Sequence, residues 1–397
     1  MPRFEPFRAL RYTVGKPDDI GPLTSPPYDV FDETARDRLA STNPHNIVHV
    51  DYPVERDGDD RYAKCARTLD SWVAQGVIGR DDTATFSLYR MRFTDESGSH
   101  RETVGVIGAL EVVDEGAGGV LPHERTTPKA KTDRLDLTRA TSCNLSPVWG
   151  LSLASGLSAL LAEPGETVAH VMDSDGVEHT LERVTDPRRL AAISAAVSSQ
   201  PVLIADGHHR YAISRTFRDE RRAEGQRGDA ELTMTYVAEL VREQLSIAAI
   251  HRIVTGHDAG EVLSRIGGHY DTRDAGPVNA GTVRQMENIG ALCLVDSTGH
   301  GTFLVPREEE FAGIRNLDSA RLEHALGDLI SSVTYQHGVT EVLERLSSGT
   351  ASCAILIRPV SLEEIRRTAD TGELMPPKST FFTPKLLTGL VWRPLDA

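Results

Sequence analysis

Cysteine, basic charge and long apolar runs are all scarce in this chain, and each absence excludes a class of protein. The four cysteines, Cys65, Cys143, Cys293 and Cys353, lie far apart and form no Cys-x-x-Cys pair. Neither a zinc knuckle nor a disulfide framework is therefore indicated, and we expect buried free thiols. No apolar run approaches the roughly 18 residues that span a bilayer, and the first residues show no basic-then-apolar leader. We expect a cytoplasmic protein without a membrane partner.

The chain also lacks a surplus of basic residues. Its 43 lysines and arginines face 58 aspartates and glutamates, which gives a formal net charge of −15. A protein with this charge cannot displace many counterions from a polyanion, so we expect no nucleic-acid partner. The composition, 39% hydrophobic and 25% charged, is that of an ordinary soluble protein, and 397 residues are enough for two or three domains.

Lysine is the scarcest of the charged residues, and its positions are informative. Only six of the 43 basic residues are lysines, and four of these lie in two short segments. Lys129 and Lys131 belong to the first segment, and Lys378 and Lys385 to the second. An ammonium group is a compact charge on a flexible stem, which suits contact with a phosphate oxygen. We predict that these four lysines bind phosphate, with chance placement in exposed loops as the alternative.

The densest group of chemically active residues follows an apolar run at 202–204. Residues 205–212 read Ala-Asp-Gly-His-His-Arg-Tyr-Ala, which is typical of a strand, a tight turn and a helix. Such a junction points backbone N–H groups and the positive end of a helix dipole at the turn, a geometry suited to phosphate. We expect Gly207, His208, His209 and Arg210 to bind phosphate, and Asp206 to hold a divalent metal such as Mg²⁺. The alternative is a helix capped by Asp206 with surface histidines.

Two further residues suit acid–base chemistry. Glu124 lies next to His123 after a glycine-rich turn, so Glu124 can act as a base and His123 as its orienting partner. The alternative for Glu124 is an ordinary surface ion pair in a loop.

Four more residues are candidates for binding a substrate. Asp29 and its neighbour Tyr28 lie in a loop made rigid by prolines, where Asp29 can present a fixed carboxylate to a metal or an amino group. An Asx-turn is the alternative role for Asp29. Asn144 and Ser146, in a polar loop that leads into a strand, can bind polar groups of a substrate.

Helical and strand patterns alternate along the whole chain and predict an α/β (α+β) fold. The helices are expected at 31–39, 60–75, 133–141, 156–161, 187–198, 259–266, 320–326 and 339–346, besides the one after residue 207. The strands are expected at 85–93 and 103–113, which form a hairpin, and at 167–173, 178–184, 202–204, 232–241, 245–252, 291–295 and 352–357. We divide the chain into an N-terminal α+β region, 1–118, a phosphate-binding core, 119–250, and a C-terminal α+β region, 251–397, with the lysine-bearing segment 376–385.

Five segments in this order resemble one family of bacterial and archaeal proteins, the domain of unknown function 1015. The segments are Ser-Pro-Pro-Tyr-Asp-Val at 25–30, Pro-His-Glu-Arg-Thr at 122–126, Asn-Leu-Ser-Pro at 144–147, Asp-Gly-His-His-Arg-Tyr at 206–211 and Pro-Lys-Ser-Thr-Phe-Phe-Thr-Pro-Lys at 377–385. This resemblance covers nearly the whole chain.

A more distant resemblance carries more chemistry. The Pro-His-Glu and Asp-Gly-His-His-Arg elements are similar to those of free-serine kinases, which share a nucleotide-binding superfamily with sulfiredoxin and ParB-type proteins. The resemblance implies a ParB/sulfiredoxin-like core, with Glu124 as the base, Asp206 as a metal or substrate ligand, and residues 208–210 on phosphate. This chain differs in its longer spacing between the elements, its N-terminal extension and its lysine-bearing C-terminal segment.

Together these observations predict a phosphotransferase. Phosphoryl transfer needs an aligned acceptor, a base and positive charge around the moving group, and the candidate residues supply all three. We expect Mg²⁺, a donor among ATP, ADP and pyrophosphate, and a serine-like acceptor with free L-serine first, with a homodimer as an open possibility. The alternatives are a ParB-like nucleotide-binding switch, against which the absence of an evident helix-turn-helix region speaks, and a metal-dependent phosphohydrolase.

Overall fold

The computed structural model describes residues 1–95, 98–124 and 131–396, and the chain forms two compact units. Unit 1 comprises Met1–Pro122, Thr126–Leu245 and Pro384–Ala397. Unit 2 comprises His123–Arg125 and Ser246–Thr383. The lysine-bearing segment is thus divided between the units. Among the described residues, no helix has both the length and the apolar character needed to cross a bilayer.

Unit 1 is built on a large mixed sheet, to which nine strands contribute in the described part of the chain. Its order is β6-β11-β8-β12-β5-β4-β10-β9, and β1 pairs with β5. The pairs β11–β6 and β12–β8 are parallel, and the other neighbours are antiparallel. The strands are β1 (Phe4–Glu5), β4 (Phe86–Thr94), β5 (His100–Glu111), β6 (Val120–Leu121), β8 (Val148–Ser152), β9 (Glu166–Met172), β10 (Glu178–Val184), β11 (Val202–Asp206) and β12 (Leu232–Glu239).

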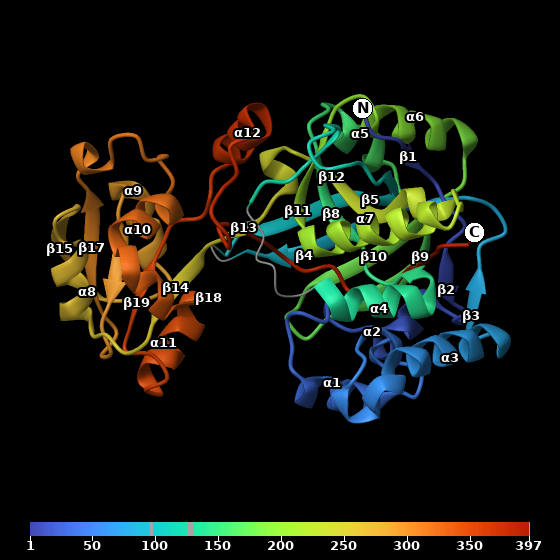
Figure 1. Ribbon diagram of the computed structural model, residues 1–397, viewed down its shortest axis with the longest axis horizontal. Coiled ribbons are helices and arrows are strands. Elements are labelled where there is room, and N and C mark those ends of the chain that lie inside the picture. Colours follow the sequence, from blue (N-terminus) through green and yellow to red (C-terminus); the bar gives the residue numbers. More distant parts are fainter. Residues whose placement is uncertain (96–97, 125–130, 397) are drawn as a thin grey trace. The chain divides into compact units, whose positions relative to one another are not determined.

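Helices cover this sheet, and a small set of them positions the site. Helices α3 and α7 both pack against α4, and α2 packs against α3 (Figure 1). Leu135 of α4 meets Ile213 and Phe217 of α7 in a small apolar cluster, which fixes these two helices side by side. The helices of unit 1 are α1 (Glu33–Thr42), α2 (Val48–Asp51), α3 (Arg61–Ala74), α4 (Lys131–Thr141), α5 (Leu157–Ala162), α6 (Pro187–Val197) and α7 (His208–Ala223).

Short two-stranded ladders bind the ends of the chain into unit 1. β2 (Leu10–Tyr12) pairs with β3 (Ile78–Arg80), and β7 (Cys143–Asn144) pairs with β21 (Arg393–Pro394). The main core lies between the sheet and the helices α5, α6 and α7, where Leu157, Ile193 and Tyr211 meet the inward side chains of the strands. This apolar layer makes the end of β11 a rigid platform for the residues that follow it.

Unit 2 has its own antiparallel sheet, in the order β15-β17-β16-β19-β14-β18. Its strands are β14 (Ile250–Val254), β15 (Tyr270–Pro277), β16 (Leu292–Val295), β17 (His300–Pro306), β18 (Val333–His337) and β19 (Cys353–Leu356). Its helices are α8 (Ala259–Ile266), α9 (Thr282–Ile289), α10 (Asp318–Leu326), α11 (Val339–Ser347) and α12 (Leu362–Thr371). Two further strands, β13 (Ile247–Ala248) and β20 (Phe381–Phe382), pair with each other and tie the segment before residue 383 to unit 2.

The predicted mixed α/β class is confirmed, and so is the hairpin, whose strands β4 and β5 pair antiparallel over their length. The single strand expected at 245–252 is wrong, because β13 and β14 belong to different sheets and are separated at Ala249. Strands from the expected regions 1–118 and 119–250 share the large sheet of unit 1. All four cysteines are buried free thiols, as expected.

Candidate functional site

The junction of β11 and α7 has the expected geometry. Asp206 is the last residue of β11, Gly207 has a positive φ of 84°, and His208 begins α7. A Cβ atom at Gly207 would lie 2.8 Å from Nε of Arg210. Glycine is therefore needed twice, for the left-handed turn and for the close approach of the arginine. This second role lets the Arg210 side chain fold back toward the carboxylate that ends the strand.

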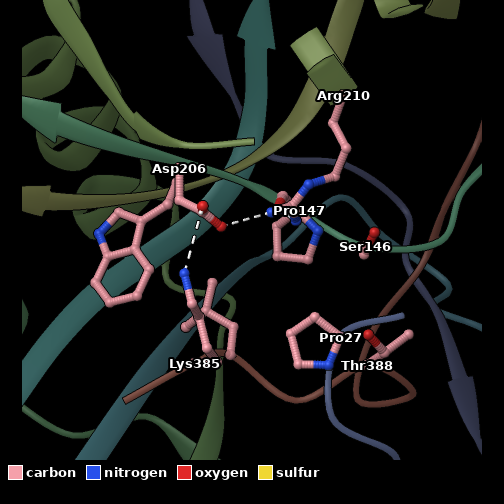
Figure 2. A pocket seen from close by; sticks show the side chains of 9 residues that line it. Pro27, Ser146, Pro147, Asp206, Arg210, Lys385 and Thr388 are labelled. Atoms are coloured by element: carbon pink, nitrogen blue, oxygen red, sulfur yellow. Dashed lines mark hydrogen bonds and ion pairs between the residues drawn. The ribbon is translucent and has the colours of Figure 1, made fainter. Parts of the chain in front are cut away.

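Two cations converge on the Asp206 carboxylate (Figure 2). Nη2 of Arg210 donates to Oδ2 at 2.7 Å, and Nζ of Lys385 lies 3.4 Å from Oδ1. Nη1 of Arg210 donates to the carbonyl of Pro147, which holds the guanidinium in place. Burial alone would raise the pKa of Asp206, but Lys385 and Arg210 hold it well below its usual range. The carboxylate is thus ionised and keeps both cations at the start of α7.

A small cavity opens beside these three side chains. Its volume of about 10 Å³ accommodates roughly one water molecule. Its lining combines charged and polar groups with apolar walls, from Pro27, Ser146, Pro147, Trp149, Asp206, Arg210, Lys385, Leu386 and Thr388. In Figure 2 Lys385 reaches Asp206 from the C-terminal segment, while Arg210 reaches it from α7. Segments far apart in the sequence therefore build one positively charged corner of unit 1.

A second cavity, of about 40 Å³, shares Ser146 and Arg210 with the first. It lies among the helices and strands that surround α4. The rest of its lining is Asp51, Arg134, Leu137, Thr138, Cys143, Asn144, Leu145, Ile213, Ser214 and Thr233. Arg210 therefore lines both cavities and connects the corner at Asp206 with the second one.

The charged pair of the second cavity was not among the predicted site residues. Asp51 ends α2 and is 2% exposed, and Nη1 of Arg134 on α4 donates to its Oδ1 at 3.0 Å. Burial raises the pKa of Asp51 to about 6, because the loss of hydration outweighs the attraction of Arg134 and Arg210. In the sequence, Asp51 follows the apolar residues Val48 and Val50 and precedes Val54. An acidic residue in such an apolar stretch is the signal that could have identified Asp51 as a candidate.

The four predicted substrate-binding residues all lie in unit 1, in different settings. Ser146 lines both cavities, and Oδ1 of Asn144 accepts a hydrogen bond from the backbone N–H of Met234 at 2.9 Å. The guanidinium of Arg134 lies 3.3 Å from the centre of the Tyr28 ring. Asp29 is exposed in a turn closed by a hydrogen bond from the N–H of Val30 to the carbonyl of Pro27. The second cavity is thus lined by Asn144 and Ser146. Tyr28 contacts Arg134, which also lines this cavity, and Asp29 lies on an exposed turn.

The predicted base and its neighbour belong to unit 2. Oε2 of Glu124 accepts a hydrogen bond from the backbone N–H of Ser379 at 3.3 Å and lies 3.8 Å from Nε2 of His123. The ring of His123 is 1% exposed and lies 2.6 Å from Oγ1 of Thr380. Both residues therefore contact the lysine-bearing segment, and the role of His123 as orienting partner of Glu124 stays a prediction.

The remaining phosphate candidates are distributed over the chain. His208 and His209 form the first residues of α7, next to Arg210. Lys378 belongs to unit 2 and has a positive φ of 58°, which is rare for a residue with a side chain. Lys129 lies outside the described residues. Lys131 begins α4, and its side chain is outside the described part of the structure.

The residues around Asp206 do not fit a divalent cation held by the protein. No group of three or more His, Cys, Asp and Glu in the described ranges could bind a metal ion. Both carboxylate oxygens of Asp206 already face cations, Arg210 and Lys385, which repel a metal. Mg²⁺ usually binds proteins through one or two carboxylates together with phosphate oxygens of the substrate. Mg²⁺ thus stays a prediction, as an ion that is bound to the phosphate groups of the donor.

Comparison with known proteins gives one family and several distant structural likenesses. The sequence profile described as "Protein of unknown function (DUF1015)" matches residues 4–320. No curated protein matches the chain significantly. A structure titled free serine kinase in complex with AMP has 14% identity and a TM-score of 0.38, covering 67% of this chain and 84% of that one.

Two other solved structures have similar scores. A conserved hypothetical protein from Pyrococcus furiosus has 14% identity and a TM-score of 0.36, covering 67% of this chain and 87% of that one. SbnI with a C-terminal truncation, from Staphylococcus aureus, has 14% identity and a TM-score of 0.39, covering 73% and 87%. At these values all three are distant likenesses.

Proposed function

The chain belongs to the DUF1015 family, whose description assigns no activity, and we propose that this member is a phosphotransferase. It moves a phosphoryl group from a nucleotide or pyrophosphate to the hydroxyl of a small metabolite, with free L-serine as the leading acceptor. The observation that carries the proposal is the convergence of Arg210 and Lys385 on Asp206 at the start of α7.

This arrangement suits a phosphate better than other ligands. Arg210 offers a planar fork of donors and Lys385 a compact ammonium, and both are kept in place by Asp206. With one carboxylate and two cations, the corner has a net positive charge, to which the dipole of a 16-residue helix adds. An incoming phosphate receives these donors without having to order them, because the protein has already done so.

The reaction needs few groups from the protein. The acceptor oxygen forms a new bond to phosphorus, the bond between phosphorus and the leaving oxygen of the donor breaks, and the hydroxyl proton passes to a base. Glu124 is the proposed base, supported by its place in the Pro-His-Glu element and by a hydrogen bond that orients its carboxylate. No step of this reaction passes through a metal held by the protein.

Phosphorus NMR tests the proposal most directly. The full chain is incubated with ATP, ADP or pyrophosphate in turn, with and without Mg²⁺, and with L-serine and other small hydroxyl compounds. A new phosphomonoester signal identifies both donor and acceptor and is the expected result. Donor loss that yields only inorganic phosphate would replace the proposal with a phosphohydrolase. Intact donors in every mixture would leave a binding protein such as a nucleotide-dependent switch.

Two variants with matched controls assign the roles. We expect Arg210→Ala to weaken pyrophosphate binding by about ten- to a hundredfold, because a charge-assisted donor is lost. Arg221→Ala, on the same helix, where Arg221 pairs with Glu224, is its control.

Glu124→Gln is expected to abolish transfer while donor binding stays unchanged, with the exposed Glu363→Gln in unit 2 as control. Full activity of Glu124→Gln would show that another group takes the proton.

A further inference from the structure

The Asp51 carboxylate has one oxygen that the protein leaves unmatched. Oδ1 accepts a hydrogen bond from Arg134, whose Nη1 also donates to the backbone carbonyl of Asp51. No described residue donates a hydrogen bond to Oδ2. The side chain is almost fully buried and lines the second cavity. Because Asp51 lines the cavity and no described residue donates to Oδ2, this oxygen is available to accept a hydrogen bond from a ligand in the cavity.

The guanidinium of Arg134 is also only partly matched. Its Nη1 binds Asp51, its plane rests on the ring of Tyr28, and the Asp133 carboxylate lies 3.7 Å from Nε. Nε itself is buried without a hydrogen bond, and Nη2 donates to no described residue. The side chain is 12% exposed and lines the same cavity. An anion in the cavity would therefore meet a fixed, stacked guanidinium.

The cavity limits the size of what can bind there. Its volume of about 40 Å³ corresponds to roughly three or four water molecules, far less than a nucleotide requires. The hydroxyl-bearing residues Thr138, Ser146, Ser214 and Thr233 also line it, besides the charged pair. Arg210 lines both this cavity and the small one beside Asp206. A small polar ligand is thus bound next to the place proposed for the phosphate.

We propose that this cavity is the acceptor subsite, and that it takes a small molecule bearing an ammonium, a carboxylate and a hydroxyl group. The ammonium donates to Oδ2 of Asp51, the carboxylate accepts from Arg134, and the hydroxyl points toward Arg210. Asp51 and Arg134 together select a zwitterion, because a ligand with only one of the two charges leaves the other member of the pair unmatched. The proposal rests on the phosphotransferase function and names the residues that choose its acceptor.

A series of related ligands tests this recognition on the wild-type full chain. Calorimetry compares L-serine, ethanolamine, 3-hydroxypropionate and glycerol, which carry both charges, only the ammonium, only the carboxylate, and neither. We expect L-serine to bind most tightly, and each single-charge compound to bind at least tenfold more weakly. Equal binding of L-serine and glycerol, or no measurable binding of L-serine, would overturn the proposal, and this measurement needs no variant to fold.

Asp51→Asn then assigns the ammonium contact. The amide keeps the size and one acceptor oxygen but loses the charge, so L-serine and 3-hydroxypropionate should bind this variant within about threefold of each other. Asp136→Asn, an exposed change on α4 where Asp136 pairs with Arg139, should keep the wild-type preference. An unchanged preference in Asp51→Asn would place the ammonium elsewhere.

Pyrophosphate binding and phosphorus NMR on the same proteins separate this proposal from the function on which it rests. Asp51→Asn should bind pyrophosphate like wild type. If L-serine binds as expected but no donor yields phosphoserine, the subsite stands and the phosphotransferase function fails. If phosphoserine forms and Asp51→Asn has the wild-type KM for serine, the function stands and the subsite is wrong.

Discussion

Two buried ion pairs in unit 1 are similarly exposed but differ in how many of their carboxylate oxygens accept a hydrogen bond. The side chains of Arg90 and Glu182 are 11% and 7% exposed, and those of Arg134 and Asp51 are 12% and 3% exposed. Nε of Arg90 donates to Oε1 of Glu182 at 3.0 Å, and Oε2 accepts from the N–H of Gly165 at 3.1 Å. Both oxygens of Glu182 therefore have a donor within the fold.

The pair on α2 and α4 lacks this completeness, and the difference separates structural from functional charge. Arg90 also donates to the carbonyl of Leu161, and Glu182 lines neither of the two cavities described above. In contrast, Asp51 and Arg134 line a cavity, and among the described residues a donor reaches only Oδ1 of Asp51. Burying a charge is costly unless hydrogen bonds compensate it. When the fold leaves hydrogen-bonding groups of a buried ion pair without partners, these groups can bind a ligand.

The largest expected effect comes from breaking the complete pair. Glu182→Gln replaces one acceptor oxygen with an NH₂ group, which must face either Arg90 or the N–H of Gly165. We expect the free energy of unfolding of unit 1 to fall by about 3 kcal/mol. Tryptophan fluorescence in urea measures this, because Trp72, Trp149 and Trp392 all belong to unit 1.

The exposed Glu166→Gln, which breaks a surface pair with Arg183, is the control and should change this free energy by less than about 0.5 kcal/mol. A loss below 1 kcal/mol in Glu182→Gln would mean that completeness of hydrogen bonding does not distinguish the two pairs.

Removing the charge of Asp51, in the incompletely hydrogen-bonded pair, should raise the free energy of unfolding and not lower it. The pKa of Asp51 is raised to about 6 in the folded protein, above its ordinary value, so the folded state binds this proton more tightly than the unfolded state. Wild type therefore loses stability as the pH rises from about 4 to about 6, and the loss persists above pH 6. Asp51→Asn resembles the protonated acid and escapes this loss. At about 1.36 kcal/mol per pKa unit, the gain at pH 8 is up to about 3 kcal/mol.

Urea unfolding of wild type and Asp51→Asn, measured side by side from pH 4 to pH 8, checks this. The difference should vanish at pH 4 and grow as the pH rises, while contributions of other titrating groups cancel. A variant that is less stable than wild type at pH 8 would show that Asp51 stabilises the fold, as Glu182 is expected to do.

Much of the fold could be predicted from the sequence, because the spacing of apolar residues indicates those helices and strands that bury one face. The helix expected at 60–75 is α3, and the hairpin expected at 85–113 is β4 and β5. The strands β15 and β18 were not predicted. Most side chains of Tyr270–Pro277 are exposed or partly exposed, and backbone pairing with β17 holds this edge strand, so no apolar alternation marks it.

The residues of the candidate site also differ in whether the sequence could identify them. The junction at 206–210 is one local element, so its glycine, carboxylate and arginine could be placed from the sequence. The contact of Lys385 with Asp206 depends on how the C-terminal segment returns to unit 1, which no local pattern encodes. Asp51 and Arg134 were missed for the same reason, since the packing of α2, α3 and α4 brings them together.

The smallest expected effect sharpens the comparison by changing only the shape of the cation. Arg134→Lys keeps a positive charge for Asp51 but loses the planar fork that rests on Tyr28 and faces the cavity. L-serine should bind about fivefold more weakly, roughly 1 kcal/mol, while the affinity for ethanolamine, which has no carboxylate, should change less than twofold. Calorimetry with both ligands measures this split, and Arg139→Lys, an exposed change on the same helix, is the control. Equal weakening of both ligands would mean that Arg134 only positions Asp51, which would make the pair on α2 and α4 a scaffold like Arg90 and Glu182.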